Sequence, residues 1–192
     1  MDTKKYMPYI KDFFSRADMV IFSLGLICSI YGIIAISSAT QSYSNSAQYV
    51  IVQALSLFVG IGAFVVITVI DVDIFAQKWQ LLVIFSVLLM SSLIVFGVTS
   101  DTGNKGWLRF FGIGIQPSEV VKIAYIIVMA KHISYLKEYK GLNKVSSVAQ
   151  LVVHFGGVIV LLLITSQDLG SSLVYFFIFF IMLFAAGLKI YW

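Results

Sequence analysis

Two long stretches without charge constrain this chain more than any other feature of its sequence. Residues 19–70 and residues 79–100 contain no Asp, Glu, Lys or Arg, and a membrane-spanning helix needs about 20 apolar residues. Overall, 60% of the residues are hydrophobic and 11% are charged, against about 45–50% and 25% in average soluble domains. So few charged groups cannot cover the apolar surface of a soluble domain, and the hydrophobicity is too high for a disordered chain. The sequence therefore predicts an integral membrane protein.

The spacing of charges predicts an all-α, polytopic bundle of six transmembrane helices. Continuous apolar runs favour helices over the alternating ten-residue segments of a membrane β-barrel. We expect residues 1–18 to form an N-terminal segment and residues 19–192 to form the transmembrane bundle. The expected spans cover about residues 19–38, 49–70, 79–98, 117–135, 147–165 and 171–188.

The basic residues orient these spans. With the N-terminus in the cytoplasm, two basic residues, Lys105 and Arg109, lie outside, and Lys122 lies within a span. The other ten lie on the cytoplasmic side: Lys4, Lys5, Lys11, Arg16, Lys78, Lys131, Lys137, Lys140, Lys144 and Lys189. Because cytoplasmic loops carry an excess of Lys and Arg, we predict a cytoplasmic N-terminus and an uncleaved first span.

Composition also narrows the ligands and cofactors. The net charge of +4 belongs to the flanks of membrane spans, so it does not indicate nucleic-acid binding. The single cysteine, Cys28, lies in an apolar run and cannot form an intramolecular disulfide. The sequence shows no metal-ligand cluster, no nucleotide-binding motif and no identifiable cofactor site.

The fourth expected span contains two charged residues near its start. Pro117 suits the first position of a helix, and Glu119 could simply favour the positive end of the helix dipole. Lys122 lies three residues further, on the same helix face, where an unpaired lysine costs about 2.5–3.5 kcal/mol on insertion scales. We therefore predict that Glu119 and Lys122 form an intramembrane ion pair facing the bundle interior.

A second candidate site lies in the connection Ser166–Gly170, which the topology places at the same membrane face. Asp168 could cap the sixth span, or it could reach Glu119 and Lys122 if the three helix segments are neighbours. We predict that Glu119, Lys122 and Asp168 form one charged cluster. His154, inside the fifth span, is expected to make a polar contact between helices.

The long outside segment, about residues 99–116, is rich in glycine and aromatic residues. It carries Lys105, Trp107, Arg109 and Gln116, which are further candidates for contact with a substrate. The alternative is an interfacial anchor with no chemical role, lying across the headgroup zone with its aromatic side chains inserted.

Three motifs together resemble the SEDS family of membrane peptidoglycan glycosyltransferases, of the RodA, FtsW and SpoVE type. The outside-loop motif of that family matches at Gly103, Lys105 and Trp107. Its central motif matches without a gap at Gln116, Pro117, Ser118, Glu119 and Lys122. Its last motif matches at Asp168, Leu169, Gly170 and Ser171. The resemblance follows the whole chain in order, and the combination of motifs is specific.

The resemblance implies polymerisation of lipid II into glycan strands at the outer face of the bacterial cytoplasmic membrane, in cell elongation, division or sporulation. It implies contact with membrane lipids and a partner, a class B penicillin-binding protein, and it leaves room for a divalent cation beside the pyrophosphate. Lys122, Lys105 and Arg109 would supply cations, and Glu119 and Asp168 would supply carboxylates. Two alternatives stay open: a flippase or transporter of lipid-linked precursors, and a non-catalytic membrane partner of the penicillin-binding protein.

Four departures separate this sequence from the family pattern. Gly106 stands where many members have Arg, and Gln167 stands where many have Pro. No basic residue precedes Gln53 between residues 41 and 53. Family members have about ten spans, and their catalytic aspartate lies in the second half, so the resemblance implies a truncated portion whose catalytic base lies beyond residue 192.

Overall fold

A computed structural model describes residues 13, 15, 17–99, 103–110 and 113–189 of the chain. The chain divides into two compact units, Met1–Asp71 and Val72–Trp192. Each unit has its own contacts between helices. A single transmembrane bundle over residues 19–192 therefore stays a prediction.

The first unit contains the helices α2 (Met19–Ala39) and α3 (Ser46–Val69), which pack against each other. Helix α2 begins at Asp18, whose carboxylate accepts the main-chain N–H groups of Val20 and Ile21. The rings of Phe22 and Phe64 stack with their centroids 4.7 Å apart. Neither helix contains a buried residue. Their apolar side chains are therefore exposed, as expected for helices that face lipid or further helices.

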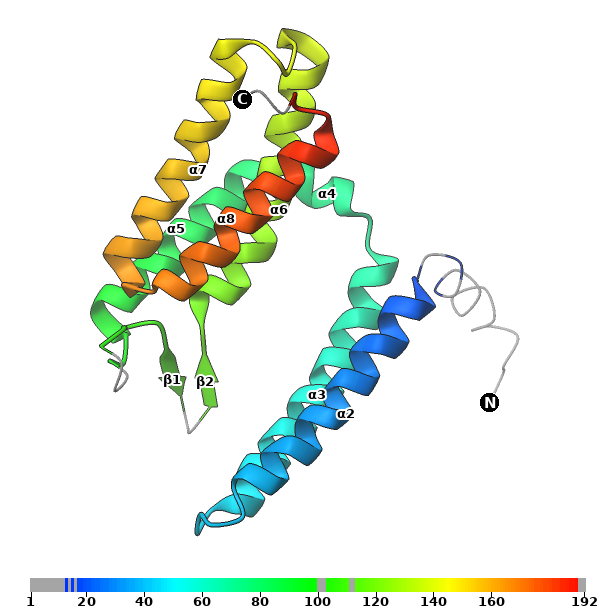
Figure 1. Cartoon of the computed structure of the whole chain (residues 1–192), viewed down its shortest axis with the longest axis vertical. Coiled ribbons are helices and arrows are strands. Elements are labelled where there is room, and N and C mark those ends of the chain that lie inside the picture. The colour runs from blue at the N-terminus through cyan, green and yellow to red at the C-terminus, as the bar shows by residue number, and fades with distance from the viewer. Residues whose placement is uncertain (1–12, 14, 16, 100–102, 111–112, 190–192) are drawn as a thin grey trace. The chain divides into compact units, whose positions relative to one another are not determined.

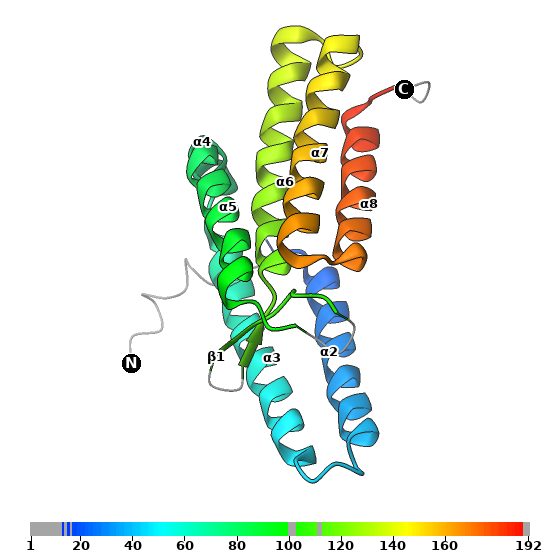
Figure 2. The ribbon, with the colours of Figure 1, turned by 90° about the vertical axis from the view of Figure 1, so that its left-hand side faces the viewer.

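The second unit contains four long helices that lie side by side (Figures 1 and 2). They are α5 (Trp79–Phe96), α6 (Pro117–Tyr135), α7 (Val145–Ser166) and α8 (Leu169–Ala186). A short helix, α4 (Val72–Gln77), precedes them, and the π-type turn η1 (Leu136–Lys140) extends α6. Helix α6 contacts α5, α7 and α8, so it is the central element of this unit.

The core of the second unit forms around the inward face of α6. Tyr125 and Met129 of α6 are buried together with Leu93 of α5, Leu162 of α7 and Tyr175 of α8. The buried residues of α6 recur at the helical spacing: Pro117, Ser118, Val121, Ala124, Tyr125, Val128, Met129 and Ile133. This period places one stripe of the helix against its three neighbours.

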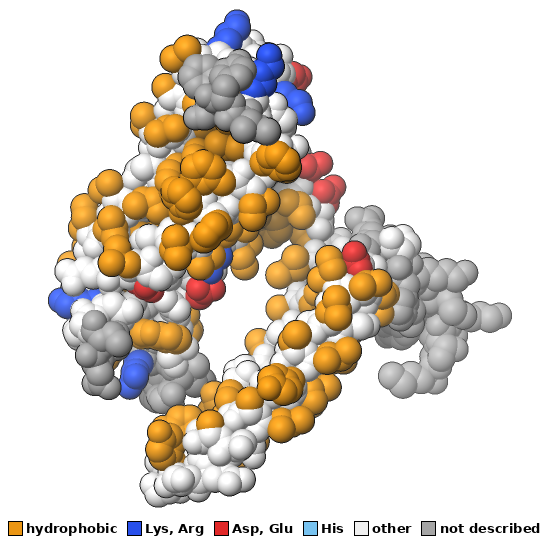
Figure 3. All heavy atoms as spheres, viewed as in Figure 1, with side chains coloured by type: hydrophobic (Ala, Val, Ile, Leu, Met, Phe, Trp, Pro, Cys, Tyr) orange, Lys and Arg blue, Asp and Glu red, His pale blue; other side chains and the backbone are white. Residues whose placement is uncertain are grey.

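Among the residues that the structure describes, five helices are long and apolar enough to cross a membrane: α2, α3, α5, α7 and α8. Figure 3 shows hydrophobic side chains over much of the visible surface of the helices, with Lys and Arg gathered toward the ends of the second unit. Helix α6 matches the fourth expected span in its bounds, but it carries Glu119, Lys122 and Lys131 and is not among the five. Helix α6 therefore differs from these five helices in its charged residues. It contacts three of the apolar helices: α5, α7 and α8.

Two short strands lie in the segment of about residues 99–116, for which the sequence predicted no strand. Strands β1 (Leu108–Phe110) and β2 (Ile113–Ile115) pair antiparallel, with Arg109 opposite Gly114. The main-chain N–H of Val98 donates to the carbonyl of Trp107 at 2.9 Å, which fastens the base of the hairpin to the end of α5. The hairpin therefore leads directly into the start of α6.

The connection between the last two helices is shorter than the sequence predicts. Helix α7 includes Ser166 and helix α8 begins at Leu169, so only Gln167 and Asp168 join them. Gln167 ends α7 in the left-handed conformation, with φ 53°, and Asp168 caps α8. These two local features turn the chain within two residues, where we expected a connection of five.

Candidate functional site

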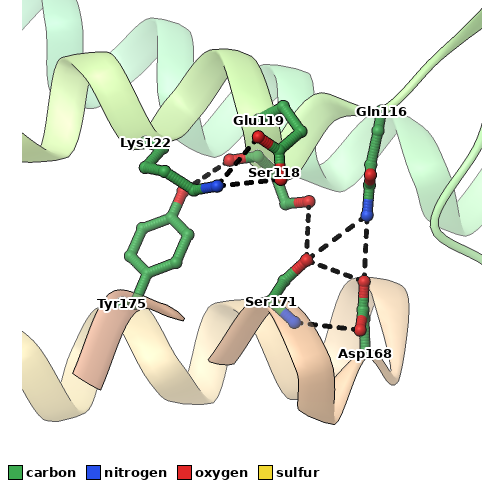
Figure 4. Close-up of polar contacts among 7 residues, drawn as sticks. All are labelled: Gln116, Ser118, Glu119, Lys122, Asp168, Ser171 and Tyr175. Carbon is green, nitrogen blue, oxygen red and sulfur yellow. Dashed lines mark hydrogen bonds and ion pairs between the residues drawn. The ribbon is translucent and has the colours of Figure 1, made fainter. Parts of the chain in front are cut away.

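The candidate site lies where α6 and α8 begin, side by side at one end of the second unit (Figure 4). Pro117 occupies the first turn of α6, where its fixed φ is favourable and its missing N–H costs no helical hydrogen bond. Gln116 precedes it in an extended conformation, and Asp168 precedes α8 in the same way. The positive ends of two helix dipoles therefore meet at this point.

The carboxylate of Asp168 is held by three donors. Its Oδ1 accepts the main-chain N–H of Ser171 at 3.0 Å, as expected for a helix cap. Its Oδ2 accepts the hydroxyl of Ser171 at 2.7 Å and the amide Nε2 of Gln116 at 2.9 Å (Figure 4). Both oxygens are therefore engaged in fixing the start of α8 to the end of the hairpin.

The chain before the hairpin passes close to this carboxylate at Gly106, which is buried. A Cβ at this position would lie 3.8 Å from Oδ2 of Asp168 and 3.7 Å from Nε2 of Gln116. Any side chain here would start in contact with both groups. Its main-chain neighbour Lys105 donates its N–H to the carbonyl of Ser166 at 3.0 Å, which ties the loop to the end of α7.

Glu119 and Lys122 form an ion pair within the first two turns of α6. The Nζ of Lys122 lies 2.8 Å from each carboxylate oxygen of Glu119. The side chain of Lys122 is 17% exposed, whereas that of Glu119 is 55% exposed. The lysine is therefore largely covered by the bundle, but the glutamate is not turned into the interior as we expected.

Two buried serines connect the first turn of α6, which carries Glu119, to the Asp168 network. The hydroxyls of Ser118 and Ser171 lie 3.2 Å apart, and Nε2 of Gln116 also contacts the Ser171 hydroxyl at 3.3 Å. The hydroxyl of Tyr175, one turn further along α8, donates to the main-chain carbonyl of Ser118 at 2.7 Å. These bonds fasten the first turns of α6 and α8 to each other.

The three residues of the predicted charged cluster thus lie at the same end of the unit but in different roles. Lys122 pairs with Glu119, while Asp168 binds Gln116 and Ser171. Among the described residues, no ion pair joins Asp168 to Lys122. The predicted cluster therefore consists of two networks. One is the ion pair of Lys122 with Glu119, and the other is formed by neutral donors on the carboxylate of Asp168; Ser118 and Ser171 connect them.

Sequence reasoning did not assign roles to Ser118, Ser171 and Tyr175. A signal was present, because Asp168, Ser171 and Tyr175 follow each other at spacings of three and four and so share one helix face. What the spacing could not show is that this face meets the first turn of α6.

The remaining loop candidates lie in the hairpin. The Trp107 ring packs across Gly114, where an added Cβ would lie 3.1 Å from the ring. Lys105 and Arg109 are exposed, and the structure shows Arg109 in the paired part of the hairpin, opposite Gly114. The hairpin orients these residues, but it does not bring Arg109 into the Glu119–Lys122 pair.

A second polar contact lies further along the helices, away from this site. The Nδ1 atoms of His132 on α6 and His154 on α7 are 3.1 Å apart, which confirms the expected polar contact of His154 between helices. Within the described part of the chain, no group of three or more His, Cys, Asp or Glu residues could hold a metal ion.

These features define a class: a polytopic α-helical membrane protein with a lysine–glutamate ion pair and a helix-capping carboxylate where two helices begin. The chain belongs to the FtsW/RodA/SpoVE family of cell cycle proteins, the SEDS family, whose model matches residues 17–192. Membership places it in the bacterial cytoplasmic membrane, with several spans.

Relatives of known name and structure agree with this assignment. The chain is 26% identical to a probable peptidoglycan glycosyltransferase FtsW of Geobacter metallireducens, over 91% of this chain and 48% of that protein. It is also 26% identical to stage V sporulation protein E of Bacillus subtilis, over 99% of this chain and 50% of that protein. The chain thus spans about half the length of the curated relatives it matches.

Two solved structures share the fold. The rod shape determining protein RodA of Thermus thermophilus matches with a TM-score of 0.67 and 23% identity, over 86% of this chain and 54% of that chain. A chain from a peptidoglycan synthase complex, studied for the coordination of polymerisation and crosslinking, matches with a TM-score of 0.66 and 22% identity. That match covers 85% of this chain and 47% of the other.

Proposed function

We propose that this chain is part of a peptidoglycan glycosyltransferase that polymerises lipid II at the outer face of the cytoplasmic membrane. Family membership and the names of its relatives support the activity. The observation that carries the proposal is the Lys122 ammonium, which is largely covered by the bundle and held at the start of α6. A fixed cation at this place can stabilise the negative charge of a lipid-linked pyrophosphate as it leaves.

The topology that this proposal needs has six spans, with α6 among them and the N-terminus in the cytoplasm. The charged residues of α6 do not prevent this helix from crossing the membrane, because Lys122 is paired and Lys131 lies close to the opposite end of the helix. In this orientation the starts of α6 and α8 lie at the outer face.

The ammonium of Lys122 keeps binding capacity although it is paired. Lysine carries three N–H donors, and the carboxylate of Glu119 accepts through two oxygens at 2.8 Å. The remaining donor can contact a phosphate oxygen while Glu119 fixes the direction of the side chain. Asp168, with three donors on its carboxylate, serves to hold Gln116 and the start of α8 rather than to accept a proton.

In the reaction we propose, the 4-hydroxyl of one sugar attacks the anomeric carbon of another, its proton passes to a general base, and the lipid pyrophosphate leaves. Lys122 would offset the charge that develops on the leaving group. We assign no general base within this chain. We also propose a class B penicillin-binding protein as partner, which the likeness to a chain of a peptidoglycan synthase complex supports.

The test uses the whole gene product, purified and incubated with labelled lipid II. Lys122→Ala should abolish glycan synthesis while the amount of folded protein stays near normal. Lys144→Ala, which removes an exposed lysine just before α7, is the matched control and should keep full activity. Normal synthesis by the Lys122→Ala protein would contradict the proposal, and movement of lipid II across vesicles without product would favour a flippase instead.

A further inference from the structure

Tyr175 makes a contact that neither the family motifs nor the charged residues account for. Its side chain is fully buried in α8, at 0% exposure. Its hydroxyl donates to the main-chain carbonyl of Ser118, at 2.7 Å, rather than to any side chain (Figure 4). A buried phenol normally finds a partner, but here the partner belongs to the first turn of another helix.

The carbonyl that accepts this bond lies in the first turn of α6, beside the ion pair. The carbonyl of Ser118 belongs to the peptide unit that continues into Glu119. In an α-helix the carbonyl of one residue faces the N–H of the residue four positions later, which for Ser118 is Lys122. The Tyr175 hydroxyl therefore restrains the peptide group on which both members of the Glu119–Lys122 pair depend.

The neighbouring contact of Ser171 acts at the same turn. Its hydroxyl lies 3.2 Å from that of Ser118, which is 1% exposed, so this serine is held through both its side chain and its carbonyl. Both bonds come from one face of α8, since Ser171 and Tyr175 are four residues apart. These two bonds thus fix the first turn of α6 to α8 without contacting the side chains of Glu119 and Lys122.

We propose that Tyr175 is a positioning residue that sets the direction of Lys122 toward the substrate pyrophosphate. The restraint on α6 follows from the geometry. Only its effect on catalysis rests on the proposed function. A displacement of about 1 Å in a reacting group can lower a rate about a hundredfold. Loss of one hydroxyl that fixes this turn should therefore reduce activity far more than it reduces the amount of folded protein.

The chain provides its own control in Tyr125. This tyrosine of α6 is 3% exposed, and its ring centroid lies 5.1 Å from that of Tyr175. Its hydroxyl has no hydrogen-bond partner within the described part of the chain. Changing either tyrosine to phenylalanine removes one buried oxygen from the same aromatic contact, but only Tyr175→Phe removes a hydrogen bond to the start of α6.

The experiment compares Tyr175→Phe with Tyr125→Phe in the whole gene product, in detergent. The first readout is kcat and KM for lipid II per amount of folded protein. The second readout is the rate at which an amine-reactive reagent acylates Lys122, measured by peptide mass spectrometry. We expect Tyr175→Phe to lower kcat by about tenfold to a hundredfold and to speed acylation severalfold, with Tyr125→Phe within twofold of the parent in both.

The outcomes separate this inference from the proposed function. Unchanged acylation and kcat in Tyr175→Phe would overturn the positioning role, as would equal losses in the two phenylalanine variants. Faster acylation only in Tyr175→Phe supports the positioning role even if Lys122→Ala turns out fully active. In that last case the role of Lys122 in catalysis fails, and the geometric inference stands.

Discussion

The amide of Gln116 and the carboxylate of Asp168 meet at 2.9 Å across 52 positions of sequence, joining the end of the β-hairpin to the start of α8. The bond has a measurable consequence because Asp168 also caps α8. Asp18 caps α2 with its carboxylate as well, but it is exposed, and among the described residues it accepts from N–H groups of its own helix.

We expect Asp18→Ala to lower stability by about 1 kcal/mol, the usual effect of losing a cap. Asp168→Ala should lower it by about 1–3 kcal/mol more, because Gln116 and Ser171 lose their charged acceptor. The loss of stability in Asp168→Asn should lie between those of the two alanine variants, because asparagine also caps helices. Chemical unfolding in detergent micelles measures all three, and equal losses for the two alanine variants would show that the Gln116 bond contributes nothing.

The left-handed conformation of Gln167 gives a second prediction. Gln167→Gly should raise stability by about 0.5–1 kcal/mol, because glycine adopts φ 53° without strain. Gln53→Gly, inside α3, should lower it by a similar amount because glycine weakens a helix interior. Gln167→Pro should lower stability by more than Gln53→Gly does, because proline fixes φ near −65°. A destabilised Gln167→Gly protein would contradict the conformation of this two-residue link.

The contact between His132 and His154 predicts an energetic coupling between α6 and α7. A double-mutant cycle with His132→Ala and His154→Ala should give about 0.6 kcal/mol, and not more than about 1.7 kcal/mol, as for other side-chain hydrogen bonds in membranes. Additive effects of the two substitutions would show that this bond does not stabilise the protein. The same cycle on His132 and Ser146, which share no contact, should be additive.

The proposed orientation predicts which side of the membrane two exposed serines face. Ser44 lies in the link between α2 and α3, and Ser146 lies near the start of α7. In a Cys28→Ala background, Ser44→Cys should react with an impermeant thiol reagent on intact spheroplasts. Ser146→Cys should react only after the membrane is permeabilised. The reverse pattern would place the starts of α6 and α8 at the cytoplasmic face and refute the proposed site.

The long helices were readable from the sequence because charged residues and glycines bound continuous apolar runs. The expected span over about residues 19–38 corresponds to Met19–Ala39, and that over about 117–135 to Pro117–Tyr135. The three-residue strands of the hairpin were missed, since such short strands show no usable alternation. The π-type turn Leu136–Lys140 was also missed, because its residue types are compatible with an ordinary α-helix.

The candidate site was predictable only in part. The pairing of Glu119 with Lys122 is local, three residues apart on one helix, so spacing alone indicates it. The contacts of Asp168 with Gln116 and of Tyr175 with Ser118 depend on how α8 packs on α6. A single sequence does not give that packing, and this is why a cluster of three charges was expected where two linked networks exist.

The bond from Tyr175 to Ser118 has an evolutionary consequence, because its acceptor is a main-chain oxygen. Every amino acid supplies that carbonyl, so drift at position 118 leaves the acceptor in place. Substitution of the donor, in contrast, removes the bond, because no other residue type places a hydroxyl at the end of an aromatic ring. Selection on this restraint therefore acts on one codon, and homologues that keep the restraint can vary at the serine while retaining the tyrosine.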